Sequence, residues 1–137
     1  FFEGTIRTFN KEVERQMTQQ FEKMIVQTAD VYGQKGSIEW ILTPPVVHND
    51  AAITKVVKSV TEKFATVVTP QVTLGAEDFA NYMEHVPGCF VFIGTGCPHE
   101  WHHPAFLVDD AALPFAIQYF VDNTNELLEV LSQKGNA

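Results

Sequence analysis

The sequence predicts an α/β protein. Short apolar segments alternate along the chain with longer segments whose apolar residues recur at spacings of three and four, and these are the patterns of strands and helices. The first third of the chain is predicted to be strand, helix, strand. The clearest single segment is the apolar run 89–93, followed by Gly94 and Gly96, which indicates a buried strand that ends in a flexible loop.

The opening strand is predicted at residues 5–9, with Arg7 pointing away from its apolar face. Asn10 predicts the start of a helix, because its side chain can accept hydrogen bonds from the first free backbone N–H groups. The helix is expected to end near Gly33, and residues 37–42 are predicted as the second strand. The apolar positions that define the helical face are Val13, Met17, Phe21, Met24 and Ile25.

Two consecutive prolines, Pro44 and Pro45, interrupt this pattern. A proline has no N–H to donate to a strand ladder, and a pair of them holds the chain extended. The sequence therefore predicts a domain boundary here, which divides the chain into residues 1–45 and 46–137. We expect the two parts to share little core.

Four further elements are predicted after the boundary. They are a helix with apolar positions Ile53, Val56, Val57 and Val60, a short interrupted strand at 67–72, a helix at 79–84 and a long last helix at 111–131. Either Asn49 or Asp50 can cap the first of these helices, and Asp109-Asp110 can cap the last. Pro114 falls in the first turn of the last helix, where a missing N–H costs little.

Composition and charge exclude several classes of protein. The 137 residues are 45% hydrophobic, which is typical of a globular protein. The net charge of -8 argues against nucleic acid or an anionic membrane as a partner, since Lys and Arg form no patch that could neutralise phosphates. Cys89 lies in a predicted buried strand and Cys97 in a loop, so we expect no disulfide between them and a reducing, cytoplasmic location. No apolar run is long enough to span a bilayer, and no signal peptide pattern is present.

Three of the five histidines, His99, His102 and His103, lie in one short loop between prolines. Such prolines disfavour helix, and a loop imidazole can ligate a metal, move a proton or hydrogen-bond to a substrate. Clustered histidines are also often only polar loop residues. Zinc needs three or four ligands, and the nearby candidates make no recognised ligand spacing. These candidates are Glu77, Asp78, Cys97, Glu100, Asp109 and Asp110.

Four segments, taken together and in order, resemble the C-terminal part of the M20 family of metallopeptidases. They are residues 4–9 (GTIRTF), 44–50 (PPVVHND), 74–79 (LGAEDF) and 101–114, which begins WHHP and ends DDAALP. The most similar branch is that of aminoacylases and hippurate hydrolases. Because the resemblance covers only the C-terminal minority of a family member, and because the chain opens on Phe1 without an initiator Met, we expect a fragment of a longer polypeptide.

The resemblance implies an architecture for this fragment. Residues 1–45 would be the second half of a lid or dimerisation domain of α+β, ferredoxin-like fold. Residues 46–137 would be the C-terminal part of a zinc-peptidase-like α/β catalytic domain. An intact family member would form a homodimer through its lid domain. This division agrees with the boundary predicted from the two prolines.

The resemblance also implies roles for individual residues. Family members bind two divalent ions (Zn, or Mn, Co or Ni), and their last metal ligand matches His102, with His103 in the neighbouring position. Arg7 matches a lid arginine that meets the substrate carboxylate, and Glu77 with Asp78 matches an acidic pair that contacts substrate or orients the metal ligands. Asn49 and His103 are further candidates to contact substrate or to orient the metal ligands. The general-base Glu is expected upstream, so no catalytic residue is assigned in this chain.

Simpler interpretations of the same residues stay open. Glu77 and Asp78 can cap the helix that begins at Phe79, Asn49 can stabilise the domain junction, and Arg7 can be a solvated surface residue. The sequence also departs from the family pattern at two positions. Ala76 stands where many members have Ser, and Asp110 stands where Glu is common.

The resemblance implies a metal-dependent amidohydrolase or carboxypeptidase-type enzyme that cleaves N-acyl amino acids, such as hippurate, or related small amides and peptides. Since one ligand cannot hold a catalytic metal, the isolated fragment is expected to be inactive and metal-free. The alternative is a non-catalytic dimerisation or binding module from a family member that has lost its other ligands.

Overall fold

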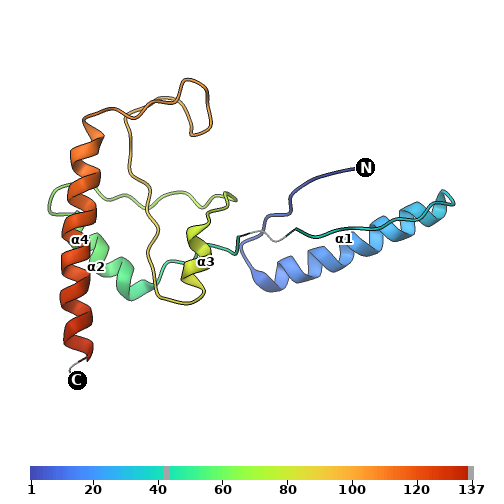
Figure 1. Cartoon of the computed structure of the whole chain (residues 1–137), viewed down its shortest axis with the longest axis horizontal. Coiled ribbons are helices and arrows are strands. Elements are labelled where there is room, and N and C mark those ends of the chain that lie inside the picture. Colours follow the sequence, from blue (N-terminus) through green and yellow to red (C-terminus); the bar gives the residue numbers. More distant parts are fainter. Residues whose placement is uncertain (42–43, 136–137) are drawn as a thin grey trace. The chain divides into compact units, whose positions relative to one another are not determined.

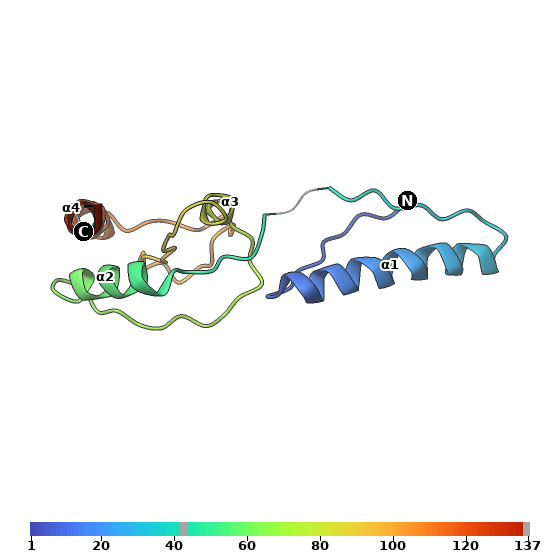
Figure 2. The same cartoon turned by 90° about the horizontal axis from the view of Figure 1, so that it is seen from below.

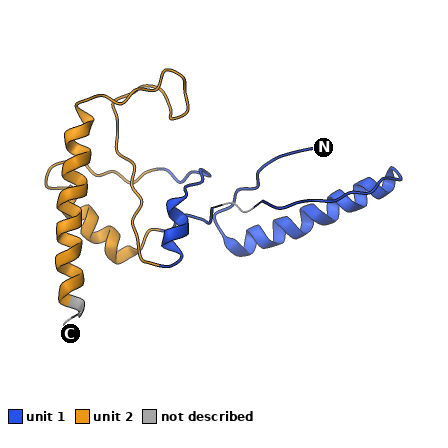
Figure 3. Ribbon diagram, viewed as in Figure 1, with its two compact units in different colours: residues 1–48, 71–85 blue, residues 49–70, 86–137 orange. Residues whose placement is uncertain are grey.

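The computed structural model of the chain describes residues 1–41 and 44–135 (Figure 1). Within them lie the helices α1 (Lys11–Val31), α2 (Ala51–Thr61), α3 (Phe79–Met83) and α4 (Ala112–Gly135). The chain forms two compact units (Figure 3): unit 1 is residues 1–48 with 71–85, and unit 2 is residues 49–70 with 86–137. The domain division at residue 45 stays a prediction, and Leu42 and Thr43, placed in the second strand and next to the boundary, lie outside the described residues.

Helix α1 begins and ends where the sequence predicts. The Asn10 side chain accepts hydrogen bonds from the backbone N–H groups of Glu12 and Val13, at 2.8 and 3.2 Å. At the other end Gly33 has a φ of 66°, a left-handed conformation that glycine adopts without steric cost. This conformation lets the N–H of residue 34 reach the Ala29 carbonyl at 2.9 Å, the pattern of a Schellman motif.

The segment after α1 turns back and runs along the helix, as Figures 1 and 2 both show. Gly36 permits this close approach, because a Cβ at this position would lie 2.8 Å from the Ile25 carbonyl oxygen. Further along, the rings of Trp40 and Phe21 pack with their centroids 6.2 Å apart. Residues 34–41 therefore cover part of the apolar face of α1.

The core of unit 2 lies between α2 and α4, which contact each other. Asp50 starts α2 by accepting hydrogen bonds from the N–H groups of residues 52 and 53, both at 2.9 Å. The apolar face of α2 then buries Val57 and Val60. Just before α4 the Asp109 carboxylate accepts from the Ala111 N–H at 2.9 Å. The predicted start of α2 is confirmed, whereas α4 begins one residue after the predicted start and continues to Gly135, beyond the predicted end at 131.

A short chain of hydrogen bonds joins the two helices. Asn123 of α4 is buried, and its amide nitrogen donates to the Tyr119 carbonyl at 2.8 Å and to the Thr61 hydroxyl at 3.3 Å. The Thr61 hydroxyl in turn donates to the Val57 carbonyl at 2.7 Å. A buried amide needs such partners, so this series of hydrogen bonds sets which residues of α2 and α4 face each other.

The start of α2 is also bound to the extended segment 88–93. The Asn49 amide nitrogen donates to the Phe90 carbonyl at 2.9 Å, and the Phe90 N–H donates to the Asn49 side-chain oxygen at 2.8 Å. The Asp50 N–H donates to the Gly88 carbonyl at 2.9 Å. The Asn49 side chain thus replaces the backbone of a neighbouring strand, and it fixes the segment that leads to the histidine loop.

No β-strand occurs among the described residues, so the strands predicted from the apolar patterns are not formed in this structure. These segments are residues 5–9, the described part of 37–42, 67–72 and 89–93. A helix satisfies its hydrogen bonds within its own segment, whereas a strand requires a neighbour with a matching ladder. The described residues provide no such ladder, although these segments are not helical.

Much apolar surface is uncovered on both units. Helix α1 buries no residue and exposes Val13, Met17, Phe21 and Met24. Helix α4 exposes Leu113, Ile117, Phe120, Leu128 and Leu131. Such apolar stripes at helical spacing are typical of faces that pack against other elements. None of the helices in the described part of the chain has the length and apolar character needed to cross a membrane.

We predict that Val60→Ala lowers the free energy of unfolding by about 2 kcal/mol, because it removes buried methyl groups and leaves a cavity. Val60 is 4% exposed between α2 and α4. The matched control is Val121→Ala on α4, where the side chain is 53% exposed and the change should stay within about 0.5 kcal/mol. Urea unfolding followed by circular dichroism measures both, and equal losses would contradict the assigned core.

Candidate functional site

The histidine loop, defined as residues 94–110, leaves the extended segment 88–93 and returns to the start of α4 (Figure 1). Its two ends are joined by a hydrogen bond from the Asp109 N–H to the Thr95 carbonyl at 3.2 Å. Gly96, with a φ of 74°, lies just after this closure and takes a left-handed turn that a side chain would disfavour. The loop is therefore closed at its base.

Cys97 makes hydrogen bonds with both sides of the histidine loop. Its sulfur accepts hydrogen bonds from the N–H groups of His99 and Leu107, each at 3.4 Å. Cys89 lies outside the loop and accepts from the Thr54 hydroxyl at 3.6 Å. Both thiols are free in this structure.

His102 has a φ of 72°, in the left-handed region that costs a residue with a Cβ about 1–2 kcal/mol. No other non-glycine residue in the described ranges has a positive φ. The side chain is exposed, and within the described part of the chain its imidazole makes no hydrogen bond, ion pair or ring contact. Backbone strain of this kind concentrates at functional sites, where the surrounding structure holds it.

His103 is occupied by contacts within the loop. Its ring stacks on that of His99, with centroids 4.3 Å apart and planes 5° from parallel. Its Nδ1 accepts a hydrogen bond from the Ala105 N–H at 3.0 Å, so Nδ1 carries no proton in this arrangement. The two neighbouring histidines therefore differ. The His103 ring makes contacts within the loop, whereas both ring nitrogens of His102 are free of contacts with the described residues.

The remaining predicted residues fall in different environments. Asn49 belongs to unit 2, and its amide is engaged by Phe90 as described above. Both partners belong to unit 2, so this contact stabilises that unit, and a role of Asn49 at the domain junction stays a prediction. Arg7 is exposed in unit 1.

Glu77 and Asp78 precede α3 in unit 1. The Glu77 carboxylate accepts from the Phe79 N–H at 3.4 Å, whereas the Asp78 side chain makes no capping hydrogen bond. Of the two acids, only Glu77 therefore follows the helix-capping interpretation. The Asp78 carboxylate stays exposed beside a pocket of unit 1.

An aromatic cluster beside the histidine loop was not predicted from the sequence. The rings of Phe92 and Trp101 stack at 5.5 Å with planes 6° apart, and Phe90 meets Phe92 edge to face at 5.2 Å. The alternation of Phe90 and Phe92 along one extended segment indicates only a buried strand. The partner in the loop could not be inferred from spacing.

The charge state of the half-buried Tyr119 side chain follows from its surroundings. Partial burial raises the pKa of the Tyr119 phenol, and the nearby Cys89 adds to this effect. Tyr119 therefore stays neutral at physiological pH.

The donor set for a metal is incomplete in this chain. Across residues 1–41 and 44–135, no group of three or more His, Cys, Asp or Glu side chains is placed to hold a metal ion. A zinc ion takes three or four protein ligands, so these residues do not by themselves fit a metal centre. His102 offers one ring nitrogen, which is one of the three or four ligands that zinc takes.

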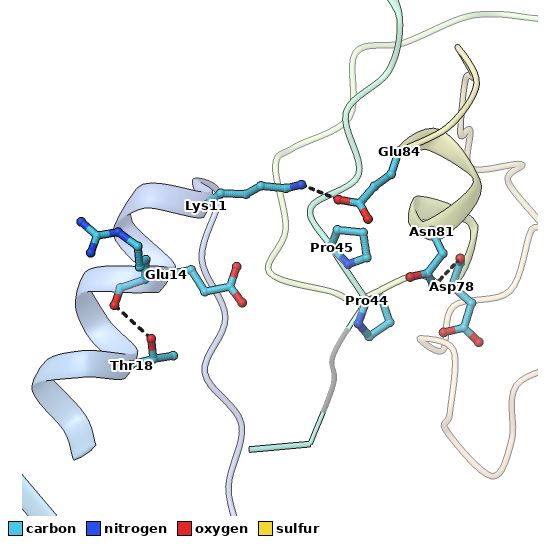
Figure 4. A pocket seen from close by; sticks show the side chains of 9 residues that line it. Lys11, Glu14, Thr18, Pro44, Pro45, Asp78, Asn81 and Glu84 are labelled. Atoms are coloured by element: carbon cyan, nitrogen blue, oxygen red, sulfur yellow. Dashed lines mark hydrogen bonds and ion pairs between the residues drawn. The ribbon is translucent and has the colours of Figure 1, made fainter. Parts of the chain in front are cut away.

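A pocket of about 620 Å³ occurs in unit 1 (Figure 4). None of the residues that line it belongs to the histidine loop. It contains no histidine. An ion pair between Lys11 and Glu84 crosses it, and this contact joins the start of α1 to the residue after α3. The lining residues are Lys11, Glu14, Arg15, Thr18, Pro44, Pro45, Asp78, Asn81 and Glu84.

Comparison with known proteins identifies the family. Residues 7–125 match Peptidase family M20/M25/M40. The chain belongs to this family. The match includes both the Arg7 segment and the histidine loop, so the resemblance of the four motifs is confirmed.

Curated relatives share the whole of this region. N-acetyl-L-cysteine deacetylase of Bacillus subtilis is 39% identical over 128 residues, which cover 93% of this chain and 31% of that protein. An N-acetylcysteine deacetylase of the same organism is 37% identical over 131 residues, or 94% of this chain and 34% of that protein. The chain thus spans about a third of the length of these relatives.

A solved structure from the same family matches the fold of this chain. The crystal structure of the Bacillus subtilis YXEP protein, a dinuclear metal binding peptidase from the M20 family, matches with a TM-score of 0.79 and 34% sequence identity. The match covers 89% of this chain and 35% of that one. This neighbour is consistent with the predicted α/β peptidase fold, and it supports divalent metals as the cofactors of the family.

We predict that Lys11→Gln raises the pKa of the Glu84 carboxyl toward its ordinary range. Hydrogen bonding and charge from Lys11 hold that pKa below its usual range, and the same contact raises the pKa of Lys11. The pair's contribution to stability is therefore present above the ordinary Glu range and lost as pH falls through the lowered value. At the alkaline end it is lost as pH rises through the raised lysine value.

Carboxyl NMR titration of Glu84 measures this shift. Lys23→Gln, on the same helix, is the matched control and should leave the Glu84 titration where it is. If Glu84 titrates identically in all three proteins, the ion pair is absent in solution.

We predict that His102→Gly leaves the chain about 1–2 kcal/mol more stable than His103→Gly. Glycine relieves the left-handed strain at position 102, whereas at position 103 it removes the ring stack and loosens the backbone. Thermal or urea unfolding of the two variants measures the difference. Equal stabilities, or the opposite order, would contradict the strained conformation of His102.

Proposed function

We propose that the complete polypeptide carrying this chain is a metal-dependent amidohydrolase that cleaves N-acyl amino acids or related small amides and peptides. The family membership of residues 7–125 supports the hydrolase class, and the names of the deacetylase relatives support an N-acyl amino acid as substrate. A hippurate-like specificity is one case within this class. The activity belongs to the complete protein, because this chain spans about a third of its relatives.

The observation that carries the proposal is the contrast between the two neighbouring histidines. His102 lies in a strained conformation with an uncommitted imidazole, while His103 is stacked and hydrogen-bonded within the loop. A metal ligand needs a free ring nitrogen and a fixed backbone. His102 meets both conditions, so it is the residue proposed to ligate the metal.

Two divalent ions, zinc or alternatively Mn, Co or Ni, are proposed for the intact site, following the dinuclear neighbour. Bound metal would polarise the amide carbonyl and lower the pKa of a bound water. This chain contributes His102, and no general base is assigned within it. We therefore propose that the isolated chain does not catalyse hydrolysis.

The other predicted residues take supporting roles in this proposal. Arg7 is proposed to pair with the substrate carboxylate, because its guanidinium is exposed and planar recognition of a carboxylate favours Arg. Asp78 keeps a free carboxylate that can orient a neighbouring ligand, more readily than Glu77, which is engaged by Phe79. His103 is proposed to hold the loop.

A role in dimerisation is proposed for the part of unit 1 around α1. That helix buries none of its residues and exposes a stripe of apolar side chains. A lid domain of α+β fold that pairs with a second copy would cover such a surface. The same surface would serve a non-catalytic binding module if the complete protein lacked the remaining metal ligands.

The deciding experiment replaces each histidine in the complete polypeptide. His102→Ala is expected to lower the metal content and also the rate of N-acetylcysteine hydrolysis, the rate by about a hundredfold. The reason is that the loss of a ligand lowers the affinity for the metal, and hydrolysis depends on the metal. His103→Ala should lower both much less.

Metal analysis and initial rates measure the two properties on the same preparations. If His103→Ala loses metal and activity while His102→Ala keeps them, the ligand is assigned to the wrong histidine. If neither variant differs from the parent protein, the loop has no part in the metal site.

A further inference from the structure

The ion pair between Lys11 and Glu84 joins two parts of unit 1 that are 73 residues apart in sequence. The other ion pairs among the described residues connect positions three or four apart on a single helix. Figure 4 shows the Lys11 side chain extending from the start of α1 to Glu84, at the end of α3. This contact therefore holds α1 and α3 together beside the pocket of unit 1.

Neither charge of this pair is placed where its own helix favours it. The helix dipole favours acids at the N-terminal end of a helix and bases at the C-terminal end. Lys11 is the first residue of α1, and Glu84 directly follows the last residue of α3. Each charge therefore lies at the less favourable end of its helix, and the contact between the two helices compensates for this.

Helix α3 depends on contacts from outside itself. It has five residues, whereas an isolated helix needs roughly 12 to 15 residues to be even marginally stable in water. The Asp78 side chain makes no capping hydrogen bond, and Ala80 is the one buried residue of the helix. A single small buried side chain gives little control over orientation, so the ion pair at Glu84 is a second attachment.

We propose that Lys11 is a positioning residue, whose ion pair with Glu84 sets the spacing between α3 and the segment that precedes α1. That segment carries Arg7, four residues before Lys11, and Asp78 directly precedes α3. The inference rests on the proposed function, in which Arg7 pairs with the substrate carboxylate and Asp78 orients a metal ligand. A substrate held by its carboxylate presents its amide bond to the metal site only while this spacing is kept.

Local hydrogen bonds connect both ends of the ion pair to these two residues. Between Arg7 and α1, the Thr8 hydroxyl donates to the Asn10 carbonyl at 3.2 Å, and the Asn10 side chain caps the helix. On the other side, the Asn81 amide nitrogen donates to the Asp78 carbonyl at 3.0 Å, across the first turn of α3. A shift of α1 relative to α3 therefore also shifts Arg7 relative to Asp78.

The test measures hydrolysis of N-acetylcysteine by the complete polypeptide. Lys11→Gln and Glu84→Gln should each lower kcat/KM by about threefold to fivefold, the range expected for an exposed ion pair. The double variant Lys11→Glu with Glu84→Lys exchanges the two charges and places each at the helix end that the dipole favours. It should return kcat/KM to within about twofold of the parent value, because the contact is restored.

Arg15→Gln is the matched control. Arg15 also lines the pocket and also forms an ion pair, but its partner is Glu12 on the same helix, at 2.7 Å. Its replacement removes a charge from the pocket and leaves the contact between α1 and α3 in place. We expect kcat/KM to stay within about 1.5-fold of the parent value.

A double-mutant cycle with Arg7 separates positioning from a general loss of structure. Lys11→Gln should lower kcat/KM in the parent protein and make no further difference in an Arg7→Ala background, because the residue through which it acts is missing. A merely structural role would lower kcat/KM by the same factor in both backgrounds. That result would overturn the proposal.

Hydrogen exchange gives a readout that does not depend on turnover. In Lys11→Gln the backbone amides of residues 79–85 should exchange about threefold to fivefold faster than in the parent, since α3 loses an attachment. In Arg15→Gln and in the charge-exchanged double variant they should exchange at the parent rate.

The outcomes separate this inference from the proposed function. If the parent protein hydrolyses N-acetylcysteine and Lys11→Gln changes neither kcat/KM nor amide exchange, the amidohydrolase stands and the positioning role is overturned. A charge-exchanged variant no more active than the single variants also overturns it. A parent protein that binds its metal but cleaves no N-acyl amino acid overturns the proposed function and this role with it. Loss in both single variants, with recovery in the double variant, supports the role of Lys11.

Discussion

The pairing of the Asn49 side chain with the backbone of Phe90 is the interaction on which the described site depends. It joins the start of α2 to the extended segment 88–93, and the neighbouring Asp50 and Gly88 add a backbone hydrogen bond. That segment leads into the histidine loop, the loop leads into α4, and α4 packs back on α2. The Asn49 side chain thus connects elements of unit 2 that are distant in sequence.

The histidine loop is shaped by a few polar contacts and by two residues with left-handed backbone conformations. The base is closed between Thr95 and Asp109, and the Cys97 sulfur accepts backbone N–H groups from both sides. Gly96 takes its left-handed turn without steric cost, but His102 takes one with a Cβ. The strain therefore lies at the residue for which the family resemblance implies a metal, while the contacts that hold the loop lie at its neighbours.

The helices and their starts could be predicted from the chain alone, because these features are local. Asn10 and Asp50 cap their helices through bonds to residues two or three positions away, Asp109 accepts from the Ala111 N–H just before α4, and Gly33 ends α1 as predicted. The strands were predicted from equally clear patterns and are not formed among the described residues. A strand pattern reports which face would be buried, whereas a strand itself needs a ladder from another segment.

The sequence by itself determined the family and the starts of α1 and α2, since these depend on short motifs and on neighbours along the chain. Only the tertiary structure decided that the Asn49 amide is bonded to Phe90, that His103 is stacked on His99, and that Trp101 lies flat on Phe92. Each of these contacts depends on the path of the backbone between the partners and on side-chain orientation. No spacing in the sequence specifies either, because a loop without regular hydrogen bonding has no fixed period.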